Sequence, residues 1–380
     1  MKLLILHNIA TSYYKNIVFN ALSKKYKDFK VVHLGEIQSN RDWKIDLSYL
    51  KYDYQVMFKG NIDNVSKIKI LFKVIKTLRM ENYDLIYLGG YSEFAYWIAL
   101  IYAKMKRKKI IIEMDSNKYN LGKKRFYKEF VKKIFVKLCD YGITYGSLSK
   151  DYLISLGIKE NNIVIKPNVT DNDFWYKESE NLKNKREEII KKNRFKKYNF
   201  IYVGRFSKEK NLFFLLDCFS KIKNKTKDKL WGLILVGGGP LEEDLKKHVI
   251  KEKIVDVFFI TFKQKNELPE YYAISDVLIL PSLSETWGIV VNESMASGLV
   301  PMISNRCGAS DLIDEGNGYL FDPEDENDLS NKMLNIIEDS LKLNLMKKNN
   351  KTKIKSFTSG FAADKIIELI NKIEKEEKDK

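Results

Sequence analysis

Two glutamates stand on either side of a glycine-containing loop that joins a predicted strand to a predicted helix. Glu285 precedes the loop, and Glu293 lies eight positions later within the amphipathic segment 289–296. Backbone N–H groups and the positive end of the helix dipole point at whatever lies above such a strand end, which suits a diphosphate. Carboxylates accept hydrogen bonds from the paired hydroxyls of a sugar or a ribose. The alternative is that both acids are solvated side chains beside a helix start.

A second predicted strand end, in NFIYVGRFSKEKN, carries Gly204 and Arg205 and is followed by Lys210. Strand ends of an open parallel sheet border the crevice where ligands bind. The guanidinium of Arg205 offers planar, bidentate donors and Lys210 a point charge, so the pair suits a pyrophosphate and the negative charge that develops as it leaves. Two surface cations beside a turn are the alternative. The coincidence of glycine, arginine and lysine at one strand end favours a ligand site.

A third predicted strand, in WGLILVGGGP, ends in Gly237 and Gly238. Glycine lets a backbone approach a ligand closely. The spacing does not fit the dinucleotide-binding fingerprint, so a tight turn is the alternative interpretation.

Short β-rich runs alternate with helical stretches throughout the chain and must position these residues. The first half contains KLLILHN, FKVVHL, DLIYLGG, KKIIIEM and YGITYG. The second half contains NFIYVGR, WGLILVGG, VDVFFIT, DVLILPS, VPMIS and GYLFD. Most of these are continuous apolar runs of the kind that is buried on both faces of a parallel sheet. The sequence therefore predicts an α/β fold with two doubly wound parallel-sheet domains.

The length of 380 residues is too great for one ordinary core and suits two domains. Turn residues in PNVTDNDFW, followed by a highly charged segment, place the predicted hinge near residues 168–172. We expect an N-terminal domain over residues 1–170 and a C-terminal domain over residues 171–355. A final helical segment, residues 356–380, is expected to pack back on the N-terminal domain.

Metal-binding and membrane-spanning patterns are not evident in the sequence. The three histidines have no partner at ligand spacing, and the three cysteines are far apart and odd in number, which suits a reducing cytosol. The acidic triplet DND at residues 171–173 is better interpreted as turn and cap chemistry, so we expect no metal site. The longest apolar run, residues 94–103, is shorter than the roughly 20 residues that span a bilayer. The first residues, MKLLILHNI, predict a strand rather than a secretory signal.

The net charge of +17 comes mainly from lysine, with only eight arginines among 67 basic residues. An AT-rich coding sequence produces such a mixture without selection for binding. Residues 104–137 nevertheless hold 13 basic and three acidic residues, which predicts a face that meets anions. Within them, residues 126–138 combine a wide apolar stripe with lysines. We interpret the stripe as a helix covering a sheet; the alternative is a cationic helix that rests on anionic lipid.

The second half resembles the retaining glycosyltransferases of family 4, which have the GT-B fold. The matching residues are GRFSKEKN, LVGGGP, ELPEYYAISDVLILPS, ETWGIVVNESMASGLVP and GNGYLFDPED, in the family's order, over about residues 200 to 326. The resemblance implies two Rossmann-like domains facing across a cleft, with the nucleotide-sugar in the C-terminal domain and the acceptor mostly in the N-terminal one. It also implies retention of the anomeric configuration without a metal or cofactor. The nucleotide-sugar is then a substrate, and a UDP-sugar is favoured over a GDP-sugar.

The resemblance also implies roles for individual residues. Arg205 and Lys210 would grip the donor diphosphate, and Glu293 would hold the ribose hydroxyls. Glu285 falls where the family contacts the donor sugar at the reacting centre. Backbone groups are expected to complete the donor site at Gly204, Gly237, Gly238, Thr286, Trp287, Gly288 and Ile289.

The first half departs from the family's commoner pattern. It has HNIATSYYKN where many members have a glycine-rich loop, and IIIEMDSNKY where many have a histidine. Asp115, or Glu113, is the candidate for the polar group near the acceptor hydroxyl, although Asp115 equally suits a helix cap. Glu93 is a weaker candidate of the same kind.

Together with this resemblance, the sequence predicts a cytoplasmic retaining glycosyltransferase, of the hexosyl- or N-acetylhexosaminyl-transferase class. Its donor would be a nucleoside-diphosphate sugar and its acceptor a glycan or lipid-linked molecule of cell-surface polysaccharide or glycoconjugate biosynthesis. An anionic membrane surface is a further expected partner, with the protein peripheral on the inner face of the plasma membrane. The alternatives are a sugar-nucleotide epimerase or phosphorylase of the same architecture, or a basic binding protein with a decayed sugar site. The scarcity of arginine clusters argues against a nucleic-acid partner.

Overall fold

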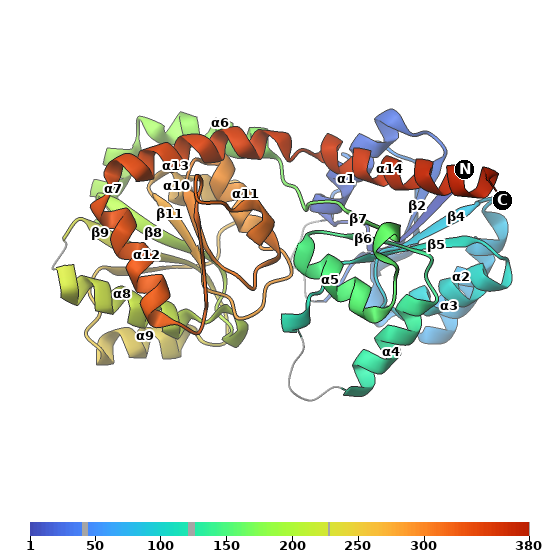
Figure 1. Cartoon of the computed structure of the whole chain (residues 1–380), viewed down its shortest axis with the longest axis horizontal. Helices are drawn as coiled ribbons and strands as arrows, with labels where there is room; N and C mark the ends of the chain where they lie inside the picture. The colour runs from blue at the N-terminus through green and yellow to red at the C-terminus, as the bar shows by residue number, and fades with distance from the viewer. Residues whose placement is uncertain (40–44, 121–125, 227–228, 380) are drawn as a thin grey trace. The chain divides into compact units, whose positions relative to one another are not determined.

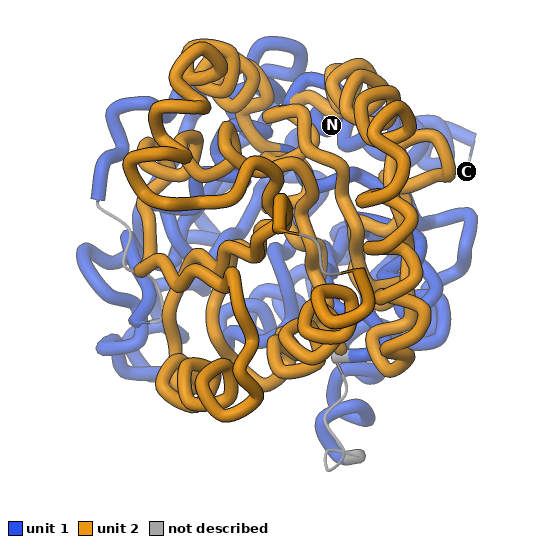
Figure 2. Tube along the Cα trace, turned by 90° about the vertical axis from the view of Figure 1, so that its left-hand side faces the viewer, with its two compact units in different colours: residues 1–169, 359–380 blue, residues 170–358 orange. Residues whose placement is uncertain are grey.

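The chain forms two compact units in a computed structural model that describes residues 1–39, 45–120, 126–226 and 229–379. The first unit comprises Met1–Val169 together with Ser359–Lys380, and the second comprises Thr170–Thr358 (Figure 2).

The first unit contains a parallel sheet that has seven strands among the described residues. Its strand order is β3-β2-β1-β4-β5-β6-β7, so the chain reverses its winding between β1 and β4. The strands are β1 (Leu3–Ile9), β2 (Phe29–Ile37), β3 (Tyr54–Asn61), β4 (Leu85–Leu88), β5 (Lys109–Met114), β6 (Tyr141–Thr144) and β7 (Ile163–Ile165). The five predicted strands are present, and β3 and β7 are additional.

Helices cover both faces of this sheet (Figure 1). Side chains of α2, α3, α4 and α5 join one buried cluster with one face of the strands. Side chains of α1 and α14 form the corresponding cluster on the other face, so the sheet is buried on both sides. The helices are α1 (Tyr13–Lys25), α2 (Lys67–Met80), α3 (Phe94–Met105), α4 (Phe126–Lys137), α5 (Ser147–Leu156) and α14 (Ser359–Lys378).

The second unit repeats the same architecture with a parallel sheet of six strands among the described residues. Its order is β10-β9-β8-β11-β12-β13, and the winding reverses between β8 and β11. The strands are β8 (Tyr198–Arg205), β9 (Trp231–Gly238), β10 (Val257–Ile260), β11 (Val277–Leu280), β12 (Val300–Ser304) and β13 (Tyr319–Phe321). All six were predicted from their apolar runs.

Two groups of helices accompany this second sheet. Helix α6 packs against α10 and α11, and α8 packs against α9 and α12. The α-helices are α6 (Asn172–Lys183), α7 (Arg186–Asn193), α8 (Leu212–Thr226), α9 (Glu242–Lys251), α10 (Leu268–Ala273), α11 (Ile289–Ala296), α12 (Glu326–Glu338) and α13 (Ser340–Lys353). The 3-10 turns among the described residues are η1 (Ile62–Asn64), η2 (Lys118–Asn120), η3 (Glu160–Asn162), η4 (Lys208–Lys210), η5 (Gly308–Leu312) and η6 (Ile354–Ser356).

Helix α4 corrects one interpretation of the sequence. The apolar stripe of residues 126–138 was expected to cover the sheet, but Phe130 and Ile134 are exposed by 64% and 40%. Phe135 and Val136 fill the core position instead, because a helix that carries apolar residues on two sides can bury only one of them.

None of the described helices is both long enough and apolar enough to cross a bilayer.

Candidate active site

The donor-side candidates gather at one edge of the second sheet. Arg205 ends β8 and Lys210 lies in the 3-10 turn η4 just after it, while Glu285 follows β11. β8 and β11 are hydrogen-bonded neighbours, and they are the two strands at which the winding reverses. In an open parallel sheet, the connections leave the carboxyl edge in opposite directions at such a point and open a crevice for a ligand. The topology therefore assigns these residues to the position where this fold binds ligands.

An ion pair joins Lys210 to Glu285. The Lys210 ammonium contacts Oε2 of Glu285, and the two side chains are only 17% and 14% exposed. Asn211, in the left-handed conformation, ends η4 and donates from its side chain to the carbonyl of Pro323 at 2.8 Å, which fixes the turn that carries Lys210. Arg205 is exposed, and its carbonyl accepts a hydrogen bond from the Tyr202 hydroxyl at 2.9 Å. The end of β8 thus carries a paired cation, Lys210, and an exposed one, Arg205.

The loop from Glu285 to Gly288 is held rigidly by the segment after β12. The amide of Gly308 donates to the Glu285 carbonyl at 3.1 Å, and the amide of Ala309 donates to the Trp287 carbonyl at 3.0 Å. The approach is so close that a side chain at Gly308 would meet the Thr286 carbonyl at 2.0 Å. The backbone of the loop is therefore positioned before any ligand arrives.

Helix α11 begins directly after this loop. Gly288 is its N-cap residue with φ +86°, a left-handed conformation that glycine adopts without strain. The indole of Trp287 is buried and donates to Asn292 Oδ1 at 2.8 Å, which ties the loop to the helix. The first amides of a helix, here those of Ile289 and Val290, have no partner within the helix and stabilise an anion. The predicted strand-loop-helix unit is confirmed.

Glu293 lies on α11 and is 3% exposed. Its Oε2 accepts a hydrogen bond from the Tyr272 hydroxyl at 3.0 Å, and the Tyr272 ring in turn packs edge-on against Trp175. A buried carboxylate whose orientation is fixed in this way can accept hydrogen bonds from ligand hydroxyls.

The glycines at the ends of β8 and β9 differ in how closely the backbone packs around them. A side chain on Gly237 would lie 1.9 Å from the Gly204 carbonyl, and Gly237 has φ +148°. Gly238 differs, because a side chain there would meet only the flexible Glu242 carboxylate, at 3.3 Å. Close contact between two strand ends therefore explains Gly237, whereas Gly238 leaves the backbone open to a ligand.

Residues 185–353, which include every one of these donor-side candidates, match the family model described as glycosyl transferases group 1. The second unit is a group 1 glycosyltransferase domain. Solved structures extend the likeness to the whole chain. HepE of Anabaena in complex with UDP has a TM-score of 0.76 at 19% identity, covering 98% of this chain and 100% of that one. The chain therefore has the predicted GT-B fold of two Rossmann-like domains.

Curated relatives also align over most of the chain. The Escherichia coli UDP-Gal:alpha-D-GlcNAc-diphosphoundecaprenol alpha-1,3-galactosyltransferase is 26% identical over 323 residues, which are 82% of this chain and 80% of the relative. An uncharacterized 41.2 kDa protein in the cps region of Klebsiella pneumoniae is 28% identical over 283 residues, or 72% of this chain and 75% of the relative.

The sequence did not single out Lys265, which the structure places at the same edge of the group 1 domain. It follows β10 and lies 3.6 Å from the Asp171 carboxylate. Burial lowers the pKa of Lys265, and the nearby carboxylates of Asp171 and Glu293 oppose that shift. Its position after a strand end was the available signal. As predicted for DND, Asp171 caps a helix, since it accepts from the Phe174 amide at 3.1 Å.

Glu113 and Asp115 of the first unit lie in contrasting surroundings. Glu113 is buried near the end of β5 and pairs with Lys15 and with Lys166, the latter at 2.8 Å. Burial alone would raise the pKa of Glu113, but the two lysines hold it well below its usual range. Asp115 is exposed and interacts electrostatically with Lys15. Asp115 is therefore the more accessible of these two carboxylates.

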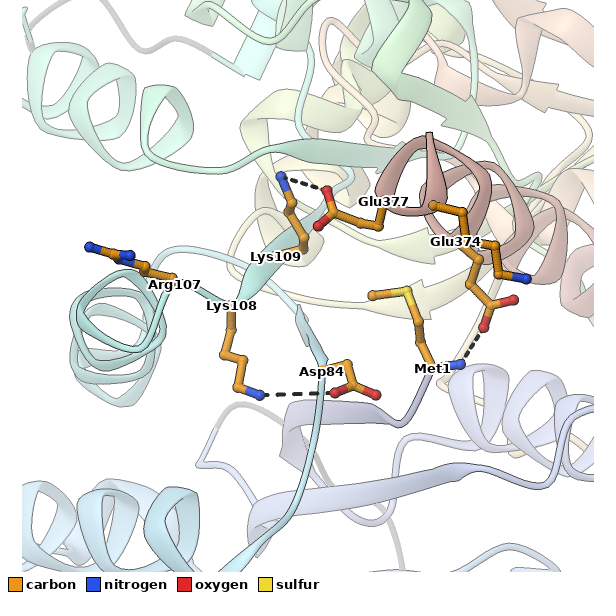
Figure 3. A pocket seen from close by; sticks show the side chains of 8 residues that line it. Met1, Asp84, Arg107, Lys108, Lys109, Glu374 and Glu377 are labelled. Carbon is orange, nitrogen blue, oxygen red and sulfur yellow. Dashed lines mark hydrogen bonds and ion pairs between the residues drawn. The ribbon is translucent and has the colours of Figure 1, made fainter. Parts of the chain in front are cut away.

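A pocket of about 470 Å³ lies at the opposite, amino edge of the first sheet (Figure 3). Several of its charged side chains pair with one another: Lys109 pairs with Glu377 at 3.2 Å, and the amino terminus pairs with Glu374. It lies between α14 and the first residues of the strands, and none of the candidate residues lines it. Among the described residues, no group of three or more His, Cys, Asp or Glu side chains is arranged to hold a metal.

Proposed function

We propose that this glycosyltransferase is a retaining enzyme that transfers a hexosyl or N-acetylhexosaminyl group from a UDP-sugar to a glycan or lipid-linked acceptor. The observation that carries the proposal is the Lys210–Glu285 pair at the winding reversal of the group 1 domain. It sets a cation for the diphosphate beside a carboxylate for the sugar hydroxyls.

The donor is supported by neighbours of the same fold. HepE was solved in complex with UDP and with UDP-glucose, and the name of the Escherichia coli relative specifies UDP-Gal. In this chain Glu293 would accept from the ribose hydroxyls, while the amides from Thr286 to Ile289 and the backbone at Gly204 and Gly238 would lie against phosphate and sugar. Lys265 would add a further cation at this edge.

The proposed reaction is a front-face substitution. The bond between the anomeric carbon and the diphosphate oxygen breaks, and the acceptor oxygen forms its bond to the same face of that carbon. The acceptor proton passes to the departing diphosphate, so a side-chain base is not required. Arg205, Lys210 and the α11 amides stabilise the charge on the diphosphate as it leaves, which takes the place of a metal ion.

The acceptor side rests on the first unit. We assign Asp115 to the acceptor hydroxyl because it is exposed at the end of β5, whereas Glu113 is occupied by two lysines. One relative is named for a diphosphoundecaprenol-linked acceptor and another for its cps region, and both support a role of this chain in cell-surface polysaccharide or glycoconjugate synthesis. We place that role in the cytoplasm, with the protein peripheral to the membrane.

The test is UDP release from a panel of UDP- and GDP-sugars with and without lipid-linked and glycan acceptors. We expect acceptor-dependent release of UDP, retention of the anomeric configuration in the product, and no loss of rate with EDTA. An Asp115→Asn variant should weaken acceptor use while leaving UDP binding intact.

The same assay separates the alternatives. An epimerase would interconvert donor sugars without an acceptor, and a phosphorylase would need inorganic phosphate. Either result, or the absence of thermal stabilisation by any nucleoside diphosphate, would refute the proposed transfer.

A further inference from the structure

Helix α4 of the first unit carries two apolar faces. One face, which includes Phe135 and Val136, is buried against the sheet. The other faces solvent and consists of side chains at the three- and four-residue spacing of one helix side: Tyr127, Phe130, Val131, Ile134 and, directly after the last helical residue, Leu138. We call these five residues the outer stripe. Scattered exposed apolar side chains are normal, but five on one helix face form a continuous patch, which marks an interaction surface.

Neighbouring helices of the same layer also expose apolar side chains. The ring of Trp97 on α3 packs against Phe135 with centroids 4.8 Å apart, so α3 and α4 are in direct contact, and α2 packs on α3. Each contributes large apolar side chains to the solvent: Phe72 on α2 is 68% exposed, and Ile101 on α3 is 56% exposed. All three helices therefore show apolar groups outside the core they share.

The charges on this layer have one dominant sign. Lys128, Lys133 and Lys137 on α4 are exposed, and none of them takes part in the ion pairs of the described chain segments. Glu129 is the one acid within α4, and it is engaged by the buried Lys132 at 2.7 Å. Helix α2 adds a further set of basic side chains: Lys67, Lys69, Lys73, Lys76 and Arg79.

We propose that the outer stripe of α4 docks on the surface of an anionic lipid bilayer, with its apolar side chains at the boundary between headgroups and acyl chains. An amphipathic helix that combines an aromatic-aliphatic face with flanking lysines has the composition of an interfacial membrane helix. Each lysine near the surface gains from the negative potential of anionic lipids. The surface belongs to the first unit and is independent of the donor-side residues of the second.

A second copy of the chain fits this surface less well than lipid does. Dimerisation through the outer stripe would bring Lys133 and Lys137 of one copy near the same residues of the other, and like charges repel. A bilayer with anionic headgroups neutralises these lysines and buries the apolar groups in a single contact.

The three native cysteines are buried, so an introduced cysteine can be labelled selectively. Phe130→Cys is labelled with a polarity-sensitive fluorophore and mixed with vesicles of phosphatidylcholine, with or without phosphatidylglycerol. We expect a blue shift with phosphatidylglycerol vesicles that decreases at about 0.5 M salt, because screening weakens the lysine contribution. A label at Leu341, which is 82% exposed on α13 of the second unit, is the matched control and should not shift.

Vesicle co-sedimentation of unlabelled protein gives an independent measurement. Phe130→Ser with Ile134→Ser should lower the fraction bound by about tenfold or more, since both removed side chains enter the interface. Leu341→Ser with Leu345→Ser is the control pair, because it removes two exposed apolar residues at the same spacing from another lysine-rich helix. Lys133→Glu with Lys137→Glu should abolish the preference for anionic vesicles.

Thermal stabilisation by UDP is recorded for every variant. Loss of vesicle binding with unchanged UDP stabilisation supports the docking surface, and vesicle binding without any UDP effect would refute only the proposed function. The docking surface would be overturned if the Phe130/Ile134 variant bound vesicles as well as wild type, or if wild type did not bind vesicles at all. It would also be overturned if wild type dimerised in a concentration-dependent way and this variant did not.

Discussion

The Lys210 ammonium and the Glu285 carboxylate form an ion pair although the residues are 75 positions apart in the sequence. Each comes from a segment that follows a strand flanking the winding reversal of the second sheet. The pair keeps both largely buried charges in place without a ligand, so that neither has to be oriented when a diphosphate sugar binds.

Removal of Lys210 should impair transfer far more than removal of its neighbour. Lys210→Ala is expected to lower kcat/KM for the UDP-sugar by roughly 10²–10³, because a cation that stabilises the leaving diphosphate is lost. Lys208→Ala, in the same turn but exposed, should have little effect. Steady-state kinetics of UDP release measures both, and equal rates for the two variants would contradict the assigned role.

Glu293 should govern nucleotide affinity rather than the chemical step. Glu293→Gln is expected to weaken UDP binding by about tenfold, since a neutral amide accepts weaker hydrogen bonds from ribose hydroxyls than a carboxylate does. Tyr272→Phe removes only the 3.0 Å hydrogen bond that orients Glu293, so its effect should be smaller. Calorimetric titration with UDP gives both affinities, and a Glu293→Gln protein with wild-type affinity would refute this prediction.

Substitution by alanine should affect the stability of the protein differently at the two adjacent glycines that end β9. Gly237→Ala places a methyl group 1.9 Å from the Gly204 carbonyl at a left-handed φ, and should destabilise the second unit by about 3 kcal/mol or more. Gly238→Ala meets only the mobile Glu242 side chain and should cost less than about 1 kcal/mol. Thermal unfolding distinguishes them, and similar melting temperatures would show that the strand ends separate easily.

His7 should make the first unit sensitive to mild acid. Burial first, and then the charge of Lys15, lowers its pKa to about 4, while its Nδ1 donates to the Ile9 carbonyl at 3.1 Å. In the unfolded chain, His7 takes up a proton near pH 6.5, whereas in the folded chain it stays neutral until the pH reaches about 4. The free energy of unfolding therefore falls as the pH drops from about 6.5 towards 4, by about 3 kcal/mol in total. Burial also holds the pKa of His33 well below its usual range, which adds to the same trend.

The control for that trend is His7→Asn, which keeps a donor near Ile9 and cannot titrate. Melting temperatures measured across this pH range should decline less steeply in the variant. An unchanged slope would assign the acid sensitivity to other groups.

The sequence predicted the strands that carry the donor-side candidates because continuous apolar runs are read reliably as buried parallel strands. It missed β3 and β7 for local reasons. β3, an edge strand with the sequence YQVMFKGN, mixes polar and apolar residues, and β7 has only three residues. Neither pattern differs from that of a loop.

Contacts between distant residues could not be read from the sequence. Glu113 was a candidate for the acceptor side, but its engagement by Lys15 and Lys166 depends on the meeting of α1, β5 and the segment after β7. Likewise, periodicity showed that α4 is amphipathic without showing which of its two apolar faces meets the sheet. Tertiary packing decides both questions.

Helix α14 has a consequence for the order in which the units form during synthesis. Its buried residues, among them Ile366 and Ile370, complete the core on one face of the first sheet. Helix α1 covers part of that face, but the part that α14 covers stays open to water until the ribosome has also produced all of the second unit. The nascent N-terminal half therefore keeps part of its apolar core uncovered while residues 170–358 are made, which exposes it to chaperones. The group 1 domain can reach its native state earlier than the unit that precedes it.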